Sequence, residues 1–287
     1  MAKTELNLSN TVVRVTDHEN AQTESTTTIA GLKVYEYLPT LPTTDMTVTL
    51  VHGGMDRGRS FRRLANQLAN RGVRVVTYDR RGYGDSLSES YKSLHEAPTF
   101  EEHISDLSEV IGKSRGILFG HSIGGTISLA ATAKAMVNPL ALVTYEAPLP
   151  FMEFWRQNGP YAFNREELDL QYAASFAKEF MIRMVGEEVW NRLPPSTRER
   201  RIAEGPTLVS EMSTAAHYHS FKPSAITTPT LICCGSIAPK RHLQATQYLA
   251  STIESAKAEI IDGADHGIHL SRPSIMAEVL SNLLAKL

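Results

Sequence analysis

The chain has 287 residues, enough for one large domain or for a domain that carries an insertion. Its formal net charge of -2 excludes the strongly basic composition of a nucleic-acid or acidic-membrane binder. No apolar run approaches the ~20 residues that cross a bilayer, and residues 1–6 lack the apolar core of a signal peptide. Cys233 and Cys234 are adjacent inside an apolar run, which favours buried thiols over a disulfide. We therefore expect a cytoplasmic protein.

Strands and helices are predicted to alternate along the first half of the chain. After a frayed segment over residues 1–10, apolar alternation predicts outer strands at 11–15 and 32–37, paired as an antiparallel hairpin. Buried strands are predicted at 48–51, 73–78, 117–119 and 140–145, and helices at 61–70 and 100–111. This β-α-β-α order favours a mostly parallel sheet covered on both faces.

The alternation breaks after residue 150. Helices are predicted at 166–184, 187–191, 196–203 and 207–217, with no strand among them, and the arginines at 192, 198, 200 and 201 are expected to form a solvated face. Strands at 230–234 and 258–262 then alternate with helices at 241–252 and 274–287. The simplest organisation is an α/β core of residues 1–150 and 223–287, interrupted by a helical domain over residues 151–222.

One short motif points to chemistry. The pentapeptide Gly120-His121-Ser122-Ile123-Gly124 lies between a predicted strand and a predicted helix. A Gly-x-Ser-x-Gly pattern in that place is typical of a nucleophile elbow, a turn so sharp that the serine hydroxyl is exposed. Side chains two residues on either side of the serine would collide, and glycine avoids the clash. Ser122 is therefore the candidate nucleophile.

With three further segments in the same order, the chain resembles a lidded member of the α/β-hydrolase superfamily. These segments are His-Gly-Gly at 52–54, Asp-Arg-Arg-Gly-Tyr-Gly-Asp-Ser at 79–86 and Gly-Ala-Asp-His-Gly at 263–267, each after a predicted strand. The resemblance implies the α/β-hydrolase fold, with flanking helices and a helical cap inserted after the sixth strand. It also implies that Ser122 is the nucleophile and His266 the general base, with an oxyanion hole formed by the backbone N–H groups of Gly54 and Ile123.

The third member of the triad departs from the usual family pattern. The family usually carries an aspartate after the strand that follows the cap, but residues 234–241 hold no carboxylate and Ala238 stands at that place. A histidine base needs an acceptor for its other nitrogen. Glu146 ends the strand after the nucleophile helix, a position that some haloalkane dehalogenases and lactone hydrolases of the family use for their acid. We predict the triad Ser122–His266–Glu146, with Asp262 as the alternative acid.

The cap is expected to cover an apolar substrate cavity above Ser122. Its aromatic and methionine side chains either form a small core of their own or line that cavity, and Phe151, Trp155 and Met184 are the candidates for lining it. The predicted reaction is hydrolysis of an ester, lactone or related acyl bond of a small, largely apolar substrate through an acyl-enzyme. We expect no metal or organic cofactor, no nucleic-acid or membrane partner, and a monomer or homodimer.

Several other functions stay open. A C–C bond hydrolase or a cofactor-free perhydrolase would use the same triad, and a ligand receptor could keep the fold without the chemistry. A peptidase of the proline iminopeptidase type would want an acidic site for the substrate amine, for which Glu153, Glu166 and Glu167 are weak candidates. Epoxide hydrolases and haloalkane dehalogenases of the family use an aspartate at the elbow, so Ser122 argues against both.

Overall fold

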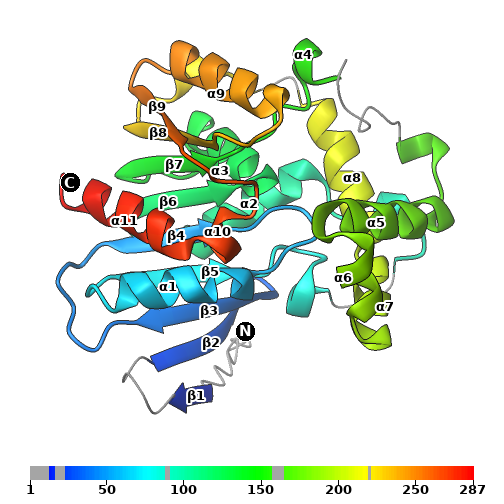
Figure 1. Cartoon of the computed structure of the whole chain (residues 1–287), viewed down its shortest axis with the longest axis horizontal. Coiled ribbons are helices and arrows are strands. Elements are labelled where there is room, and N and C mark those ends of the chain that lie inside the picture. The colour runs from blue at the N-terminus through cyan, green and yellow to red at the C-terminus, as the bar shows by residue number, and fades with distance from the viewer. Residues whose placement is uncertain (1–12, 17–22, 88–90, 157–164, 219–220) are drawn as a thin grey trace, which may run out of the picture.

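A twisted, mostly parallel sheet forms the centre of the computed structural model, which describes residues 13–16, 23–87, 91–156, 165–218 and 221–287 (Figure 1). The nine strands lie in the order β1-β2-β3-β5-β4-β6-β7-β8-β9. Neighbours from β5 to β9 run parallel, whereas β1, β2 and β3 pair antiparallel and β3 joins β5 antiparallel. The strands are β1 (Val13–Thr16), β2 (Thr23–Ile29), β3 (Leu32–Leu38), β4 (Thr47–Val51), β5 (Arg74–Tyr78), β6 (Gly116–His121), β7 (Ala141–Tyr145), β8 (Thr230–Gly235) and β9 (Ala256–Ile261).

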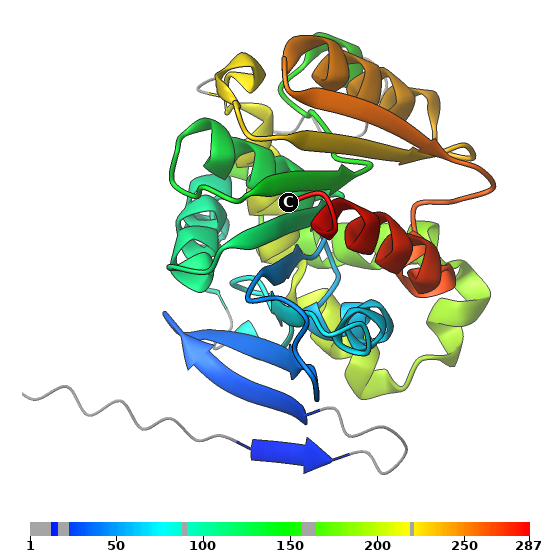
Figure 2. The same cartoon turned by 90° about the vertical axis from the view of Figure 1, so that its left-hand side faces the viewer.

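Helices cover both faces of the sheet, which explains why its central parallel strands are largely apolar. In β6, Ile117 and Phe119 pack into one core with α1 and α11, and Leu118 packs into the other with α2 and α3. Figure 2 shows these two helical layers on opposite sides of the strands. No helix within the described ranges is both long and apolar enough to cross a membrane. The helices of the core are α1 (Arg62–Ala69), α2 (Phe100–Ile111), α3 (Ile123–Ala133), α9 (Lys240–Thr252), α10 (Ile268–Ser271) and α11 (Pro273–Leu284).

The amino-terminal hairpin differs from the prediction. The strand that pairs with β3 is β2, not the segment at 11–15, and it was missed because Thr23–Ile29 is polar and carries no apolar alternation. Its threonines are β-branched and suit a strand, and Ala30 and Gly31 both take positive φ, as a two-residue hairpin turn requires. Val13–Thr16 instead pairs with the outer edge of β2. Residues 1–10 lie outside the described part of the chain.

The inserted helices lie beyond the carboxyl ends of the parallel strands (Figure 1). They follow the seventh strand rather than the sixth, because β2 adds one strand to the count. Phe176, Phe180 and Trp190 form a small core of their own that also includes Met55 and Tyr83 of the sheet domain. The inserted helices are α4 (Glu153–Arg156), which the sequence did not indicate, α5 (Leu170–Val185), α6 (Glu187–Arg192), α7 (Pro195–Ala203) and α8 (Gly205–Ala216).

Buried charges fasten α8 to the sheet domain. Glu211 of α8 forms an ion pair of 2.6 Å with Arg80, and both side chains are fully buried. Glu204, at the start of α8, pairs with Arg57 at 2.7 Å. The expectation of a solvated arginine face is wrong for Arg201, which donates a hydrogen bond of 2.6 Å to the carbonyl oxygen of Met55. Breaking such a buried pair is costly, so α8 is held in one place.

Candidate active site

Ser122 lies in a strained turn between β6 and α3. Its backbone has φ 53° and ψ -132°, a region that residues other than glycine seldom adopt. A Cβ on Gly124 would lie 2.4 Å from the carbonyl oxygen of Val51, and one on Gly120 would lie 2.5 Å from the Cα of Gly125. Both glycines are therefore required by close backbone contacts, and the turn presents the Ser122 side chain at the carboxyl edge of the sheet.

The structure brings His266 and Glu146 together from two different strands. Glu146 directly follows β7, and His266 lies in the loop after β9. His266 Nδ1 donates to Glu146 Oε2 at 2.6 Å, and the other carboxylate oxygen of Glu146 accepts the N–H of Gly235 at 3.1 Å. With Nδ1 committed to Glu146, Nε2 of His266 is the nitrogen left for Ser122, which lines the same pocket. No hydrogen bond joins Ser122 to His266 here, and such contacts often tighten only when substrate binds.

Neither of the aspartates near His266 in the sequence takes the place of Glu146. Asp262 accepts a hydrogen bond of 3.4 Å from Ser236, and Asp265 accepts the N–H of Gly267 at 3.0 Å. Among the described residues, Glu146 is the one carboxylate within hydrogen-bond distance of the His266 ring. The alternative acid Asp262 therefore has no geometric support.

The Glu146 side chain is a buried carboxylate. Its backbone has a positive φ of 47°, and its side chain is 1% exposed. Burial opposes ionisation, but the hydrogen bond and charge of His266, with the Gly235 N–H, hold the pKa of the Glu146 carboxyl below its usual range. The carboxylate is thus ionised at neutral pH and can stabilise an imidazolium at His266.

Two backbone N–H groups in the pocket suit an oxyanion hole. Gly54 and Ile123 both line the pocket beside Ser122, and Ile123 is the first residue of α3, so its N–H has no intrahelical acceptor. Within the described residues, no hydrogen bond takes up the N–H of Gly54. The Arg80 side chain fixes the backbone of the loop at residues 52–54, because it donates hydrogen bonds to the carbonyl oxygens of His52 and Gly53, each at 3.0 Å.

His52 itself has a structural role, as expected. Its Nε2 accepts the backbone N–H of Arg80 at 2.8 Å, and its Nδ1 donates to the carbonyl oxygen of Gly53 at 2.7 Å. Burial, with the neighbouring Arg80 charge, lowers the pKa of His52 to about 3. The ring is therefore neutral at physiological pH and serves to hold the oxyanion loop.

A pocket of ≈ 250 Å³ opens over Ser122 between the sheet domain and the inserted helices. Trp155 and Met184 line it, as expected, but Phe151 does not; its ring packs edge-on against Phe221 instead. A wider depression of ≈ 660 Å³ between β9 and α11 holds none of the candidate catalytic groups. The sequence did not single out several other lining residues, which are Phe180, Arg183, Met212, Pro239, Arg241 and His242.

His242 is the unforeseen lining residue that lies next to the candidate acid and base. Its Nδ1 lies 3.1 Å from the backbone carbonyl of Glu146, which can only accept, so Nδ1 carries the proton. Burial, with the nearby charges of His266 and Arg241, lowers the pKa of His242 to about 4. His242 is therefore neutral at physiological pH. Its ring also packs edge-on against Trp155, with centroids 4.9 Å apart.

Two clusters bring possible metal ligands within 4.8 Å of one another. One is Glu146, His242 and His266, and the other is Asp56, His121 and His269. Hydrogen bonds within the protein already account for both, since His266 binds Glu146 and His269 Nε2 binds Asp56 at 3.1 Å. The second cluster connects the segment after the oxyanion loop with the segment after His266. The expectation of a metal-free reaction stays a prediction.

The comparisons with known proteins concern the family and the fold. Residues 50–279 match the model of the alpha/beta hydrolase family. The chain belongs to this family. A relative from Synechocystis sp., named "Putative non-heme chloroperoxidase", is 26% identical over 83% of this chain and 90% of its own length. Epoxide hydrolase 3 of Xenopus tropicalis is 22% identical over 82% of this chain and 70% of its own length.

Solved structures show the same fold. MenH from S. aureus is 19% identical with a TM-score of 0.66, covering 88% of this chain and 98% of its own. A thermophilic esterase from Thermogutta terrifontis is 19% identical with a TM-score of 0.62, covering 96% and 98%. At these identities the likeness concerns the fold alone. The α/β-hydrolase fold predicted from four sequence segments is thus confirmed, and this α/β-hydrolase carries a serine at its elbow.

Proposed function

We propose that this α/β-hydrolase is a serine hydrolase that cleaves an ester, lactone or related acyl bond through an acyl-enzyme. The observation that carries the proposal is the 2.6 Å hydrogen bond between His266 Nδ1 and the buried Glu146 carboxylate, in the pocket that also exposes Ser122. A serine hydroxyl is almost un-ionised at neutral pH and needs such a base. The receptor alternative is less well supported, because an inactive scaffold has no need for a buried anion behind the histidine.

In the first half of the reaction, Ser122 Oγ attacks the acyl carbon and His266 Nε2 takes its proton. The negative charge moves to the carbonyl oxygen, where the N–H groups of Gly54 and Ile123 stabilise it by roughly 3 kcal/mol per donor. His266 then gives the proton to the leaving oxygen, the bond to that oxygen breaks, and the acyl-enzyme remains. Glu146 stabilises the imidazolium throughout.

In the second half, water takes the place of the leaving group. His266 Nε2 removes a proton from the water, whose oxygen attacks the acyl carbon, and the same N–H groups stabilise the second oxyanion. The Ser122 oxygen leaves with the proton from His266, which releases the acid. We further propose that residues 151–222 act as the substrate-selecting cap, because Trp155 and Met184 of this segment line the pocket.

The test is labelling with a fluorophosphonate probe and peptide mass mapping, together with turnover of 4-nitrophenyl acetate and butyrate. We expect a covalent adduct on Ser122 and measurable turnover of both esters, with both signals lost in Ser122→Ala. Folded wild-type protein that takes no label and turns over neither ester would overturn the proposal and restore the receptor alternative.

A perhydrolase is the second candidate, favoured by the chloroperoxidase name of the Synechocystis relative. Hydrogen peroxide would then replace water in attack on the acyl-enzyme, giving a peroxy acid and free Ser122. Peracetic acid formed from acetate and hydrogen peroxide, absent in Ser122→Ala, would support it. Ester hydrolysis without any peroxy acid would leave the hydrolase proposal standing alone.

A further inference from the structure

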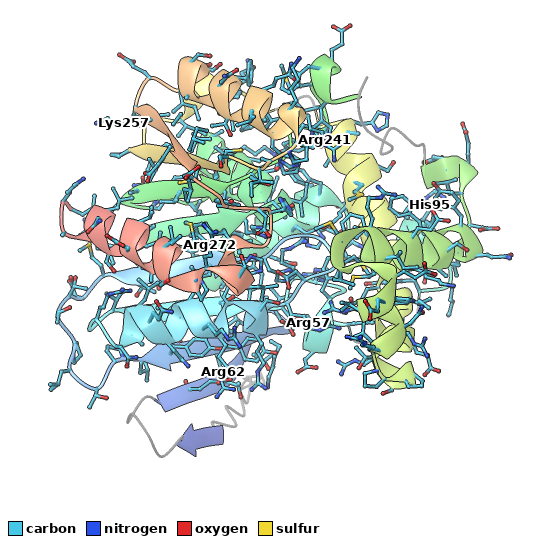
Figure 3. The ribbon with its side chains drawn as sticks, viewed as in Figure 1. Arg57, Arg62, His95, Arg241, Lys257 and Arg272 are labelled. Atoms are coloured by element: carbon cyan, nitrogen blue, oxygen red, sulfur yellow. The ribbon has the colours of Figure 1, made fainter. Side chains whose placement is uncertain are left out.

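The sheet ends at β9, whose outer edge pairs with no other strand of the described residues. Residues 257–260, in the middle of this strand, are all exposed, and the side chain of Ile260 is 51% exposed. The register with β8 is continuous from Ala256 to Ile261, so no bulge interrupts the edge. Figure 3 shows Lys257 on the side of the molecule away from the inserted helices. An open strand edge without a bulge or a proline is a template for another strand.

The hydrogen bonds to the neighbouring strand show which backbone groups of β9 point outward. The carbonyl oxygens of Ser255 and Ile261, at the two ends of β9, accept N–H groups from β8 and the residue after it, at 3.2 Å and 3.0 Å. In a parallel pair, alternate residues direct their backbone groups to the neighbour, so the odd-numbered residues of β9 face β8. Both backbone groups of Ala258 and the N–H of Ile260 therefore point away from the sheet. No hydrogen bond within the described ranges takes them up.

The side chains of this edge are complementary to a second copy of the same edge. Lys257 and Glu259 lie two positions apart on one face of β9, and neither takes part in an ion pair among the described residues. A two-fold axis through Ala258 sets Lys257 of each copy opposite Glu259 of the other in an antiparallel pair. Because the backbone of Ala258 points outward, the two alanines form a hydrogen-bonded pair. The lysine and glutamate then occupy the non-hydrogen-bonded positions, where opposite side chains lie closest.

The neighbouring two-fold registers are less favourable. An axis through residue 257 sets two lysines opposite each other, and an axis through residue 259 sets two glutamates opposite each other, and like charges in such positions are destabilising. The axis through Ala258 also places the exposed Ile260 beside Ala256 of the other copy, whose small side chain leaves room for it. One register thus satisfies the charges, the backbone and the shape of the edge together.

We propose that two copies of this chain associate through their β9 edges, in the antiparallel register centred on Ala258, and so form one continuous sheet. The inference does not depend on the proposed hydrolase function, because none of residues 256–261 lines the pocket over Ser122. A two-fold axis perpendicular to the sheet keeps α11 of both copies on the same face. Each depression between β9 and α11, with its half-buried Leu231, Ile275 and Val279, then borders the second copy.

Light scattering after size-exclusion chromatography measures the association. We expect the mass of two chains at about 100 μM, since a dimer with micromolar affinity is then mostly associated. Ala258→Pro should give the mass of one chain, because proline removes an outward N–H of the edge and spares the hydrogen bonds to β8. Circular dichroism shows whether this variant is folded, and the charge variants below test the same register without a proline.

Exchanging the two charges of the edge tests the register itself. Lys257→Glu sets glutamates opposite each other at both pairs, and Glu259→Lys does the same with lysines, so each should weaken the association by about tenfold or more. The double variant Lys257→Glu/Glu259→Lys exchanges the charges and should restore the dimer. The matched control is Lys113→Glu, which reverses an exposed charge after α2 and should leave the association unchanged.

The outcomes decide between this interface and its alternatives. A dimer that each single reversal weakens and the exchange restores supports the inference, because only a direct pairing of the two positions gives that pattern. Wild-type protein with the mass of one chain at the stated concentration overturns it, and the edge is then open to a strand of another protein. A dimer that persists in Ala258→Pro and in both single reversals overturns it as well, since a different face then forms the interface.

Discussion

Replacing Glu146 by glutamine tests the least expected part of the candidate site. The amide keeps the size of the side chain and can still accept the N–H of Gly235, which the carboxylate binds at 3.1 Å. Its NH₂ group, however, would face His266 Nδ1, where the carboxylate now accepts at 2.6 Å. His266 would then carry its proton on Nε2, the nitrogen that must accept the proton of Ser122.

The size of the loss follows from the geometry. Opposite unit charges 2.6 Å apart attract by about 6 kcal/mol at an effective dielectric constant of about 20. In serine triads, changing the acid to its amide lowers kcat by about 10⁴-fold, which corresponds to about 5.5 kcal/mol. The two figures agree, so we expect Glu146→Gln to lower kcat by three to four orders of magnitude, as estimated from that comparison.

The assay is turnover of 4-nitrophenyl butyrate, with circular dichroism to show that the variant is folded. Asp262→Asn is the matched control, because Asp262 lies in the His266 loop and contacts Ser236 instead of His266. We expect the control to keep activity within about threefold of wild type, since it touches none of the reacting groups. A Glu146→Gln protein with near wild-type kcat, beside an inactive Asp262→Asn, would refute the reasoning.

Three further predictions concern stability. Gly124→Ala places a Cβ 2.4 Å from the Val51 carbonyl oxygen and should cost about 3 kcal/mol or more of unfolding free energy; a denaturation midpoint like wild type would show that the turn can relax. Glu211→Gln leaves the Arg80 charge buried without its partner and should cost about 3–5 kcal/mol in urea denaturation, whereas a loss under 1 kcal/mol would contradict the buried pair. Burial raises the pKa of Glu204 to about 7 despite the opposing charge of Arg57. The unfolding free energy should therefore fall by up to about 3 kcal/mol between pH 4.5 and 7, as the folded protein loses that proton. Glu204→Gln should remove this fall, and an unchanged dependence of the unfolding free energy on pH would exclude Glu204 as its cause.

Much of the architecture was predictable because its signals are local. The helix at 100–111 was predicted with the bounds of α2, since apolar residues recur there at helical spacing. The structure adds a capping box between Thr99 and Glu102 at its start. The strands β4 to β8 were recognised from short apolar runs, because both of their faces are largely buried. The strand β2 was not recognised, because its polar threonines carry no hydrophobic period.

Some residues of the candidate site also have local sequence signals, and others do not. Ser122, Gly54 and Ile123 stand within motifs whose backbone geometry is dictated over a few residues, so the sequence could point to them. The pairing of Glu146 with His266 was inferred from the lack of a carboxylate at 234–241 and from the alternative acid position that some family members use, and the structure supplies the hydrogen bond itself. Phe151 was misplaced because no periodicity in residues 151–156 shows that its ring turns toward Phe221.

The sequence by itself determined the elbow, most of the order of strands and helices, and the segment inserted after β7, because each depends on contacts between near neighbours in the chain. Only the tertiary structure decided which side chains meet across long separations. Arg183 and Arg241 lie 58 positions apart in sequence, on α5 and α9, and share one pocket because the inserted helices fold back over the sheet edge. Glu211 and Arg80 likewise meet only when α8 docks. Such pairs depend on packing directions that no local pattern encodes, since the direction of a side chain is set by the face that its element buries.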